Sequence, residues 1–176
     1  MSDLLKLLSR LRQGSFAPLF ILLLLTQSAG SFAGNGLPPF TQADSSGGGI
    51  TDGLDVGAIR LGSHRGFDRL VIDVTYWEGA LMDAGKPASA VGHFSLSAEV
   101  KGVEYSLELG GFRAFSASFP IFSDDSRIAS LVRRKGEDYE DDSTLSLLIT
   151  FKREQCYRAF SLEQPARIVI DVADCR

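Results

Sequence analysis

Apolar and polar residues alternate along the chain from about residue 56 to its end, with the period of two that is typical of strands burying one face. The clearest runs are residues 67–76, 94–100, 103–109, 144–151, 156–162 and 167–172. Lys101-Gly102 separates the second run from the third and is suited to a tight turn, which predicts a hairpin. Residues 126–134 fit a short helical turn as well as a strand. We therefore expect an all-β fold of about seven to nine short antiparallel strands, as a β-sandwich with two related sheets or, alternatively, a flattened barrel.

One short sequence motif occurs in two similar copies, FDRLVIDV at residues 67–74 and PARIVIDV at residues 165–172. In both copies the aliphatic residue after the Arg, the Ile and the last Val share one face, which we expect to be buried. The Arg and the Asp fall on the other face. The copies can supply equivalent strands, and one arrangement places them at related positions in two sheets. Cross-strand pairing of these charges, worth a few tenths of a kcal/mol, is favoured over direct contact with a ligand.

The first 33 residues have a different pattern. Lys6, Arg10 and Arg12 precede the uncharged apolar run FAPLFILLLL, and small and polar residues follow. This order is that of a secretory signal peptide, with cleavage expected after Ala33 or, as second choice, after Ala29. The alternative is a retained anchor, although the run is shorter than the roughly 20 apolar residues that a membrane span needs. Cleavage would leave no stable membrane anchor.

The segment that follows, residues 34–55, is rich in Gly, Ser, Pro and Asp and has no sustained apolar period. It predicts a flexible linker before a domain at residues 56–176. Cys156 and Cys175 are expected to form a disulfide in an oxidising compartment, and two separate buried thiols are the alternative. If the last two strands form a hairpin, the cysteines lie nearly opposite one another. Their bridge would then stabilise the fold by roughly 3 kcal/mol.

The charge of the chain argues against nucleic acid as a partner. The formal net charge is −4 at pH 7, and removal of the signal peptide would make it about −6. Binding to phosphates needs a basic face, which an acidic chain of this size is not expected to have. No cofactor is expected either, because the Gly-rich residues 45–50 are not preceded by a strand or followed by a helix and a suitably placed Lys.

Catalytic and metal-binding patterns are also lacking in the sequence. His64 and His93 show no zinc-ligand spacing, so we expect surface histidines and no metal site. No Gly-x-Ser-x-Gly motif is present, and no catalytic residue is expected. A cell-wall hydrolase would need a cleft in which one of these histidines meets a carboxylate and a Ser. The acidic run at residues 136–143 lacks calcium-loop spacing and is interpreted as a solvated loop.

Aromatic residues offer two further candidate sites. Phe115, Ala117 and Phe119 fit a buried strand face, whereas an exposed Phe112 with Arg113 could stack on a sugar ring. Tyr76-Trp77 is the second possible sugar platform. A competing class is a β-barrel that holds a small apolar ligand, whose cavity would be lined by phenylalanines at positions 94, 112, 115 and 119.

The stretches AIRLGSHRGFDRLVIDV and CYRAFSLEQPARIVIDV resemble the AMIN family, in particular its AMIN-like branch. The matching positions are Ile59, Arg60, Gly62, Gly66, Phe67, Asp68, Arg69, Asp73, Tyr157, Arg158, Phe160, Leu162, Pro165, Arg167, Val169 and Asp171. The resemblance implies a β-sandwich of bacterial cell-envelope proteins, in which such domains target amidases to peptidoglycan or sit in secretin assemblies. No amidase or secretin domain follows the match, so we expect a targeting module without catalytic activity.

The same resemblance, together with the charges, predicts the contact residues. The candidates for ligand binding are Arg60, His64, Arg65, Asp68, Arg69, Tyr157, Arg158 and Arg167. Arginines at such positions can bind muramyl and peptide-stem carboxylates through paired hydrogen bonds. The expected function is that of an exported, non-catalytic module, periplasmic or extracellular and wall-associated, whose partner is peptidoglycan or another cell-envelope protein.

Overall fold

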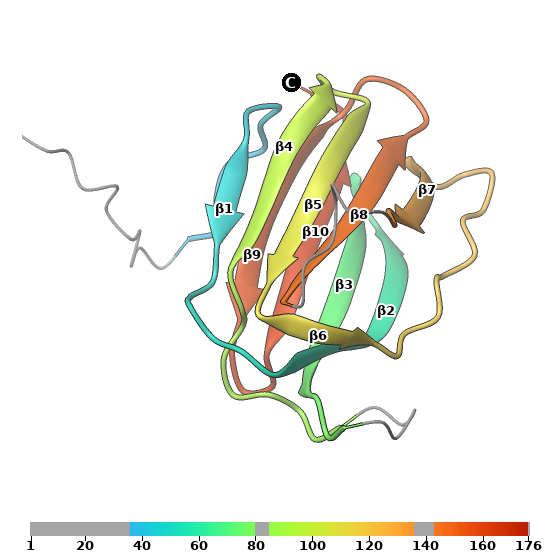
Figure 1. The fold of residues 1–176 in the computed structure, drawn as a ribbon. Coiled ribbons are helices and arrows are strands. Elements are labelled where there is room, and N and C mark those ends of the chain that lie inside the picture. The colour runs from blue at the N-terminus through green and yellow to red at the C-terminus, as the bar shows by residue number, and fades with distance from the viewer. Residues whose placement is uncertain (1–35, 80–84, 136–142, 176) are drawn as a thin grey trace, which may run out of the picture. The chain divides into compact units, whose positions relative to one another are not determined.

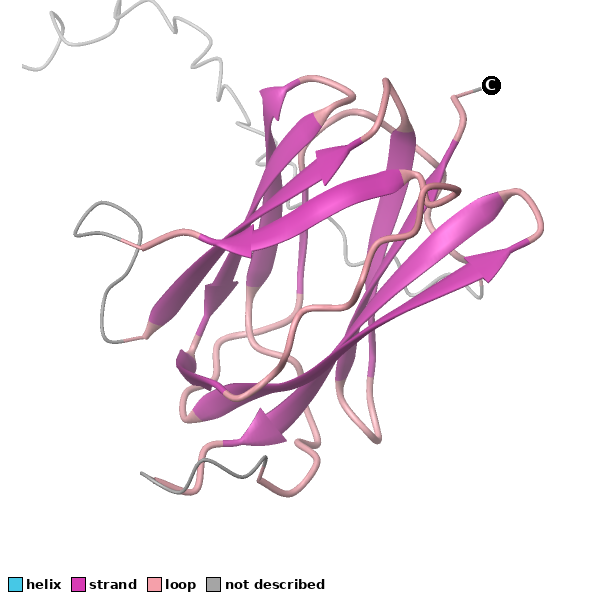
Figure 2. Cartoon of the chain, turned by 90° about the vertical axis from the view of Figure 1, so that its right-hand side faces the viewer, coloured by secondary structure: helices cyan, strands magenta, loops and turns pink. Residues whose placement is uncertain are grey.

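The computed structural model describes residues 36–79, 85–135 and 143–175. The expected signal peptide and nearly all of the acidic run lie outside these residues. The described chain is made of strands and loops (Figure 2), and no helix within it is long and apolar enough to cross a membrane. The strands are β1 (Ser45–Gly47), β2 (Leu54–His64), β3 (Phe67–Tyr76), β4 (Phe94–Val100), β5 (Glu104–Gly110), β6 (Phe112–Phe115), β7 (Ile128–Arg133), β8 (Thr144–Phe151), β9 (Cys156–Leu162) and β10 (Arg167–Ala173).

The strands form two sheets of five, stacked face to face (Figure 1). The first sheet has the order β1-β4-β5-β8-β7, and the second has the order β6-β2-β3-β10-β9. Each sheet has two edges, so the fold is the predicted β-sandwich and not the closed barrel considered as an alternative. Residues 126–134, for which a helical turn was possible, contain strand β7.

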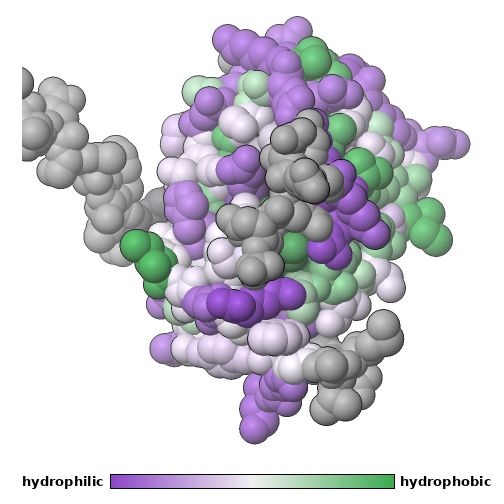
Figure 3. Space-filling model, viewed as in Figure 1, coloured by the Kyte–Doolittle hydropathy of each residue, from purple (hydrophilic) through white to green (hydrophobic). Residues whose placement is uncertain are grey.

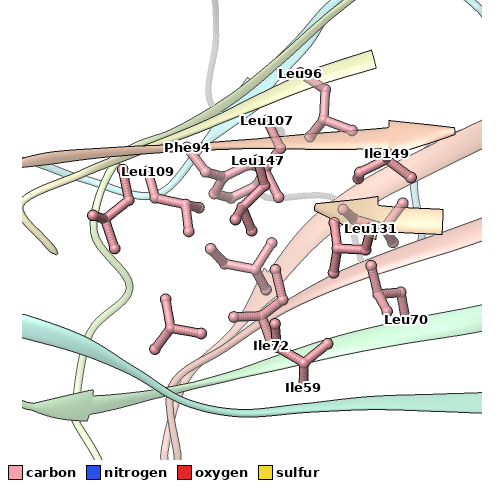
Figure 4. Packing of buried hydrophobic residues seen from close by; sticks show 14 of the residues in the cluster. Ile59, Leu70, Ile72, Phe94, Leu96, Leu107, Leu109, Leu131, Leu147 and Ile149 are labelled. Carbon is pink, nitrogen blue, oxygen red and sulfur yellow. The ribbon is translucent and has the colours of Figure 1, made fainter. Parts of the chain in front are cut away.

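Aliphatic side chains from alternate positions of both sheets fill the space between them (Figure 4). In the figure the first sheet contributes Phe94, Leu96, Leu107, Leu109, Leu131, Leu147 and Ile149, and the second contributes Ile59, Leu70 and Ile72. Leu70, Ile72 and Leu107 are fully buried. Burial of each such side chain is worth about 1.5–3 kcal/mol, so this alternation is the main source of stability.

The two copies of the repeated motif lie side by side in one sheet, as β3 and β10. They run antiparallel, with Arg69 opposite Asp171 and Asp73 opposite Arg167. The placement in two separate sheets that we considered from the sequence is therefore wrong. The antiparallel register explains the repeat, because it sets the cation of each copy against the anion of the other while three aliphatic residues of each copy point into the core.

The predicted hairpins are confirmed. β4 pairs with β5, with a register shift between Ala98 and Val100, and Gly102 in the turn has a φ of 76°, a left-handed conformation that glycine adopts without strain. β9 pairs with β10, and Cys156 forms a disulfide with Cys175 just beyond the end of β10. The bridge ties the start of the hairpin to its end.

Much of the segment expected to be a linker is part of the fold. Thr41 pairs with Tyr157 at the edge of the second sheet, and β1 pairs with β4 at the edge of the first. We call residues 40–47 the N-terminal arm. It crosses from one sheet to the other, and β2 then begins at Leu54, within the expected linker as well. Short polar residues conceal this role in the sequence, because the arm is held by hydrogen bonds and not by an apolar period.

Tyr157 is the main anchor of the N-terminal arm. It is fully buried, and its hydroxyl donates to the carbonyl oxygen of Ala43 at 2.7 Å and contacts Oγ of Ser45 at 3.1 Å. Burial raises the pKa of Tyr157 to about 12, so the hydroxyl remains a donor at all ordinary pH values. At the C-terminal end of the domain, Nε2 of Gln42 contacts Sγ of Cys175 at 3.4 Å.

The substitution Tyr157→Phe should lower the free energy of unfolding by about 1 kcal/mol, because it removes the part-buried hydrogen bond to the carbonyl of Ala43. Urea denaturation measures this loss, and limited proteolysis should show faster cleavage in the N-terminal arm. The matched control is Tyr76→Phe, whose hydroxyl bonds Ser89 at the surface and whose removal should matter less. Equal losses in the two variants would contradict the anchoring role.

Candidate functional site

Pairing of β2, β3, β10 and β9 brings half of the predicted contact residues onto the outer face of the second sheet. Alternation and register place four arginines there, around two aspartates, Asp73 and Asp171. The arginines are Arg60, Arg69, Arg158 and Arg167. We call these six residues the arginine face. They come from four strands and from both ends of the domain, so no local sequence motif contains them all.

Asp171 is at the centre of one half of the arginine face. Arg69 donates to it through Nε at 2.6 Å and through Nη2 at 2.9 Å, one bond to each carboxylate oxygen. Arg158 donates from the neighbouring strand through Nε at 2.8 Å, and its Nη2 lies 2.7 Å from the same oxygen. Paired bonds of this kind are stronger and more directional than a single contact.

Aromatic rings close this half against solvent. The guanidinium carbons of Arg69 and Arg158 lie 5.3 and 5.6 Å from the ring centre of Phe67, within the range of cation–π attraction. Phe160 lies on Arg69, and Phe40 of the N-terminal arm lies 4.6 Å from Arg158. Phe40 could not be assigned to the site from sequence, because nothing in its surroundings indicated that the arm folds back. Asp171 is fully buried as a result, although its strand face points outward.

The balance of burial and hydrogen bonding sets the charge of Asp171. Burial alone would raise its pKa, but the bonds from Arg69 and Arg158 outweigh burial and hold the pKa below its usual value. The same contact raises the pKa of Arg69, against the smaller effect of its own burial. The three groups are therefore all charged near neutral pH and carry one net positive charge.

Asp73 is at the centre of the other half, which is open to solvent. Nη2 of Arg60 donates to it at 2.6 Å, and Nε of Arg167 lies 3.7 Å from the same oxygen. The side chain of Arg60 is 58% exposed and that of Arg167 is 34% exposed, against 29% for Arg69 and 16% for Arg158. This half also carries one net positive charge, and its guanidinium groups face water.

The four remaining candidates lie elsewhere. His64 stacks on Phe67 with ring centres 4.8 Å apart, at the end of the arginine face, and Arg65 is exposed in the turn beside it. Asp68 is buried on the inner side of β3, where it accepts hydrogen bonds from Ser63 at 3.0 Å and from the backbone of Arg127 at 2.6 Å. Tyr157 is buried under the N-terminal arm.

The structure thus brings Arg60, Arg69, Arg158 and Arg167 together and separates Asp68 and Tyr157 from them. A signal for Asp68 was present in the sequence, since it has the same parity along the strand as Leu70 and Ile72.

The two outer faces of the sandwich differ in charge. On the first sheet, β4 and β5 place Glu99, Glu104 and Glu108 outward, opposite the buried aromatic and leucine positions of the same strands. This sheet is in front in Figure 1, and Figure 3 shows that hydrophilic side chains predominate on the same side, with scattered apolar ones. The outer face of the four main strands of the second sheet carries four arginines and two aspartates, whereas Asp55 and Asp68 of the same strands are buried. The described domain is therefore electrically polar, with its positive face on the second sheet.

The other candidate sites from the sequence have different surroundings. Phe94 and Phe112 are buried in the core, so Phe112 is not an exposed sugar platform. Phe115 is partly buried against the core, whereas Phe119 is 40% exposed and departs from the expected buried face. Tyr76 and Trp77 are both partly exposed.

The features required by the competing classes were examined in the same way. Neither of two surface pockets of the described part is lined by any of the four phenylalanines expected for an apolar cavity. One pocket, of about 310 Å³, is lined by His93, Asp52 and Ser143 among others. Both carboxylate oxygens of Asp52 accept hydrogen bonds from Arg113, at 2.8 and 2.6 Å, so this carboxylate orients an arginine and not the histidine. Among the described residues no cluster of His, Cys, Asp and Glu could hold a metal ion.

The substitution Asp171→Asn should lower the free energy of unfolding by about 3 kcal/mol, because two arginines would lose the charge that compensates them in a buried site. The matched control, Asp73→Asn, removes the same charge from the open half and should cost less than about 1 kcal/mol. Chemical denaturation compares the two. Similar losses would show that burial of Asp171 does not strengthen its ion pairs.

The contribution of Asp171 to the free energy of unfolding should also decrease as the pH falls. Its folded pKa is lowered, so the stabilisation is complete above the unfolded pKa of about 3.9 and is lost as the pH falls through the folded pKa. The stability difference between the wild type and Asp171→Asn should be constant between about pH 5 and 7 and shrink below about pH 4. A difference unchanged down to pH 3 would exclude Asp171 as the titrating group.

Comparison with known families is consistent with this geometry. A family model described as the AMIN-like domain matches residues 54–174, which include the central strands as well as the two terminal motifs. Comparisons with curated proteins and with solved structures gave no match. AMIN-like domains are associated with the bacterial cell envelope, typically with peptidoglycan, and are generally non-catalytic binding modules. The matched region spans all but one of the strands, and the chain therefore belongs to the AMIN-like domain family.

Proposed function

We propose that this protein is an exported, non-catalytic module that binds peptidoglycan through the arginine face. The observation that carries the proposal is the open half of this face, where the exposed Arg60 and the partly exposed Arg167 surround Asp73. Membership of the AMIN-like family supports a cell-envelope role and agrees with this chemistry.

The arginine face suits a ligand that carries several carboxylates. A guanidinium group has five N–H donors, and the described contacts of Arg60 use one of them. Muramyl groups and peptide stems of the wall present carboxylates, which arginine binds through paired hydrogen bonds. Because each aspartate is shared by two arginines, the face keeps a positive charge without strong repulsion among its own cations.

The polarity of the domain favours one orientation at the wall. The protein is acidic as a whole, with a formal net charge of −4, and a uniformly negative surface would be repelled by an anionic polymer. With the glutamates of β4 and β5 on the opposite sheet, the arginine face is the side that an anionic polymer attracts.

Export is supported by two independent features. The N-terminal order of basic, apolar and small residues is that of a signal peptide, and Cys156 and Cys175 form a disulfide of the kind that persists in oxidising compartments. The protein would then act in the periplasm or at the outer surface of the cell. An envelope protein is the alternative partner for the same face.

The first test is co-sedimentation of the purified protein with isolated sacculi. Pelleting should weaken as the salt concentration rises, because screening reduces attraction between exposed charges. Combining Arg60→Ala with Arg167→Ala should weaken binding roughly tenfold, since each variant removes charge-assisted hydrogen bonds to the ligand.

A charge-matched control separates the arginine face from general electrostatics. Lys101→Ala combined with Lys135→Ala removes the same charge from exposed positions outside the second sheet and should leave pelleting unchanged. If both double variants lose binding equally, the site is not the arginine face. If the wild type stays in the supernatant at low salt, peptidoglycan is not the ligand and an envelope protein becomes the partner to seek.

A further inference from the structure

Trp77 is the one tryptophan of the chain, and it is open to solvent, with 44% of its surface exposed. It directly follows β3, and its backbone N–H donates to the carbonyl oxygen of Gly53 at 2.8 Å. This bond continues the antiparallel pairing of β2 with β3 by one position beyond the pair of Leu54 and Tyr76. The backbone of Trp77 is therefore held by the second sheet.

The continued pairing decides which face of the sheet carries the indole ring. Side chains alternate along a strand, so Trp77 has the parity of Asp73 and points to the outer face of the second sheet. Four residues along the strand, at about 3.3 Å each, place the Cα atoms of Asp73 and Trp77 roughly 13 Å apart. Asp73 is the centre of the open half of the arginine face. Trp77 thus lies on the same face as Arg60 and Arg167, beyond the open half.

Glycines lie on both sides of Trp77 in the sheet. Gly53 is on the side of β2, and a Cβ added to it would meet no atom within 4 Å, so the space beside it is open. Gly85 is on the other side, where a Cβ would lie 1.9 Å from the carbonyl oxygen of Tyr76, so no side chain fits there. These two neighbours have no side chains that would cover the indole ring, which leaves it accessible to a ligand.

Tyr76, the other aromatic residue of the platform considered from the sequence, has a different role. Alternation turns it to the opposite side of the strand from Trp77. Its hydroxyl lies 2.8 Å from Oγ of Ser89 and accepts a hydrogen bond from the backbone N–H of Ser89 at 3.3 Å. Tyr76 therefore holds the connection that follows β3, and the two rings do not form one platform. Trp77 is the candidate for contact with a ligand.

An exposed indole on the same face as carboxylate-binding arginines defines the chemistry of the ligand. The face of an indole ring is negatively polarised, so it attracts the C–H groups on the apolar face of a sugar ring, and the indole N–H can donate to a hydroxyl. Arg60 and Arg167 suit carboxylates. The distance between the two places is longer than one sugar ring. A chain of sugars that carries carboxylates spans both of them, whereas a single sugar does not.

We propose that Trp77 stacks on a sugar ring of the glycan strand whose carboxylates bind the open half of the arginine face. The inference rests on the proposed function and deepens it, because it divides the ligand into a neutral part at Trp77 and an anionic part at Arg60 and Arg167. The two parts respond differently to salt. Screening weakens the contacts of the anionic part, whereas stacking of a neutral sugar on a ring involves no net charge and is insensitive to screening.

The test uses the tryptophan fluorescence of the purified protein, which reports on Trp77 alone because the chain has no other tryptophan. The probes are chitotetraose, a neutral chain of N-acetylglucosamine, and the disaccharide-peptide unit of the wall. Both should shift the emission to shorter wavelength in a saturable way, because a stacked sugar displaces water from the ring. The disaccharide-peptide should bind roughly tenfold more tightly, since it adds carboxylates for the arginines. Salt should weaken its binding and leave that of chitotetraose unchanged.

The decisive variant is Trp77→Ala, tested by co-sedimentation with sacculi. Pelleting should weaken roughly tenfold, as is typical when a tryptophan in contact with a ligand is removed, and should still decrease with salt because Arg60 and Arg167 are intact. Phe119→Ala is the matched control. Phe119 is 40% exposed, close to the value for Trp77, and lies outside the second sheet, so its loss should leave pelleting unchanged. The fluorescence titration needs no variant and therefore does not depend on how Trp77→Ala folds.

Three results would overturn the inference. These are an emission that neither probe changes at millimolar concentration, a response to the disaccharide-peptide but none to chitotetraose, and equal pelleting of Trp77→Ala and the wild type. The second would assign the emission change to the charged groups and not to stacking. The proposed function fails differently: the wild type then stays in the supernatant, or the double variant of Arg60 and Arg167 pellets as the wild type does. The response to chitotetraose then decides by itself whether Trp77 binds a sugar.

Discussion

Antiparallel pairing of β3 with β10 is the constraint on which both the core and the arginine face depend. The register that sets Arg69 against Asp171 also points three aliphatic residues of each strand into the core, namely Leu70, Ile72 and Val74 of β3 and Ile168, Ile170 and Val172 of β10. A slip by one residue would turn the aliphatic residues outward and bring the charges inside, at a large cost in free energy. The positions of the ion pairs are therefore fixed by hydrophobic burial, and the ion pairs in turn discriminate against other alignments of two nearly identical strands.

The two halves of the arginine face show that two copies of the same sequence motif can have different roles. Asp171 lies under Phe67, Phe160 and Phe40, and its ion pairs are withdrawn from water. Asp73 has no comparable aromatic cover among the described residues, and its ion pairs with Arg60 and Arg167 remain at the surface. Charges in the closed half contribute to stability because they are desolvated together. Charges in the open half contribute little to stability and remain available to a ligand.

The period of two predicted β3, β4, β5, β8, β9 and β10 with their buried positions and the β4–β5 hairpin, because these features depend on residues near one another in the chain. The two cysteines and the expected hairpin of the last two strands predicted the disulfide. The period could not predict that β3 and β10 are neighbours, since alternation specifies which face a residue occupies and not which strand lies beside it. The fold of the N-terminal arm could not be predicted for a related reason. Thr41 and Ser45 are held by hydrogen bonds to residues far away in the chain, and such bonds produce no periodic pattern in the sequence.

A binding face on paired strands differs from one on loops in how much conformational entropy its side chains lose when a ligand binds. Arg69 and Arg158 are already fixed by Asp171 and by the rings around them, so a ligand that contacts them need not order them. Arg60 and Arg167 are less constrained and can adjust to the spacing of a polymer's carboxylates. The same shared aspartates limit repulsion within the face before a ligand arrives, which allows four arginines to gather on an acidic protein. A rigid half beside an adjustable half suits recognition of a repeating polymer, in which the charge is constant while its local geometry varies.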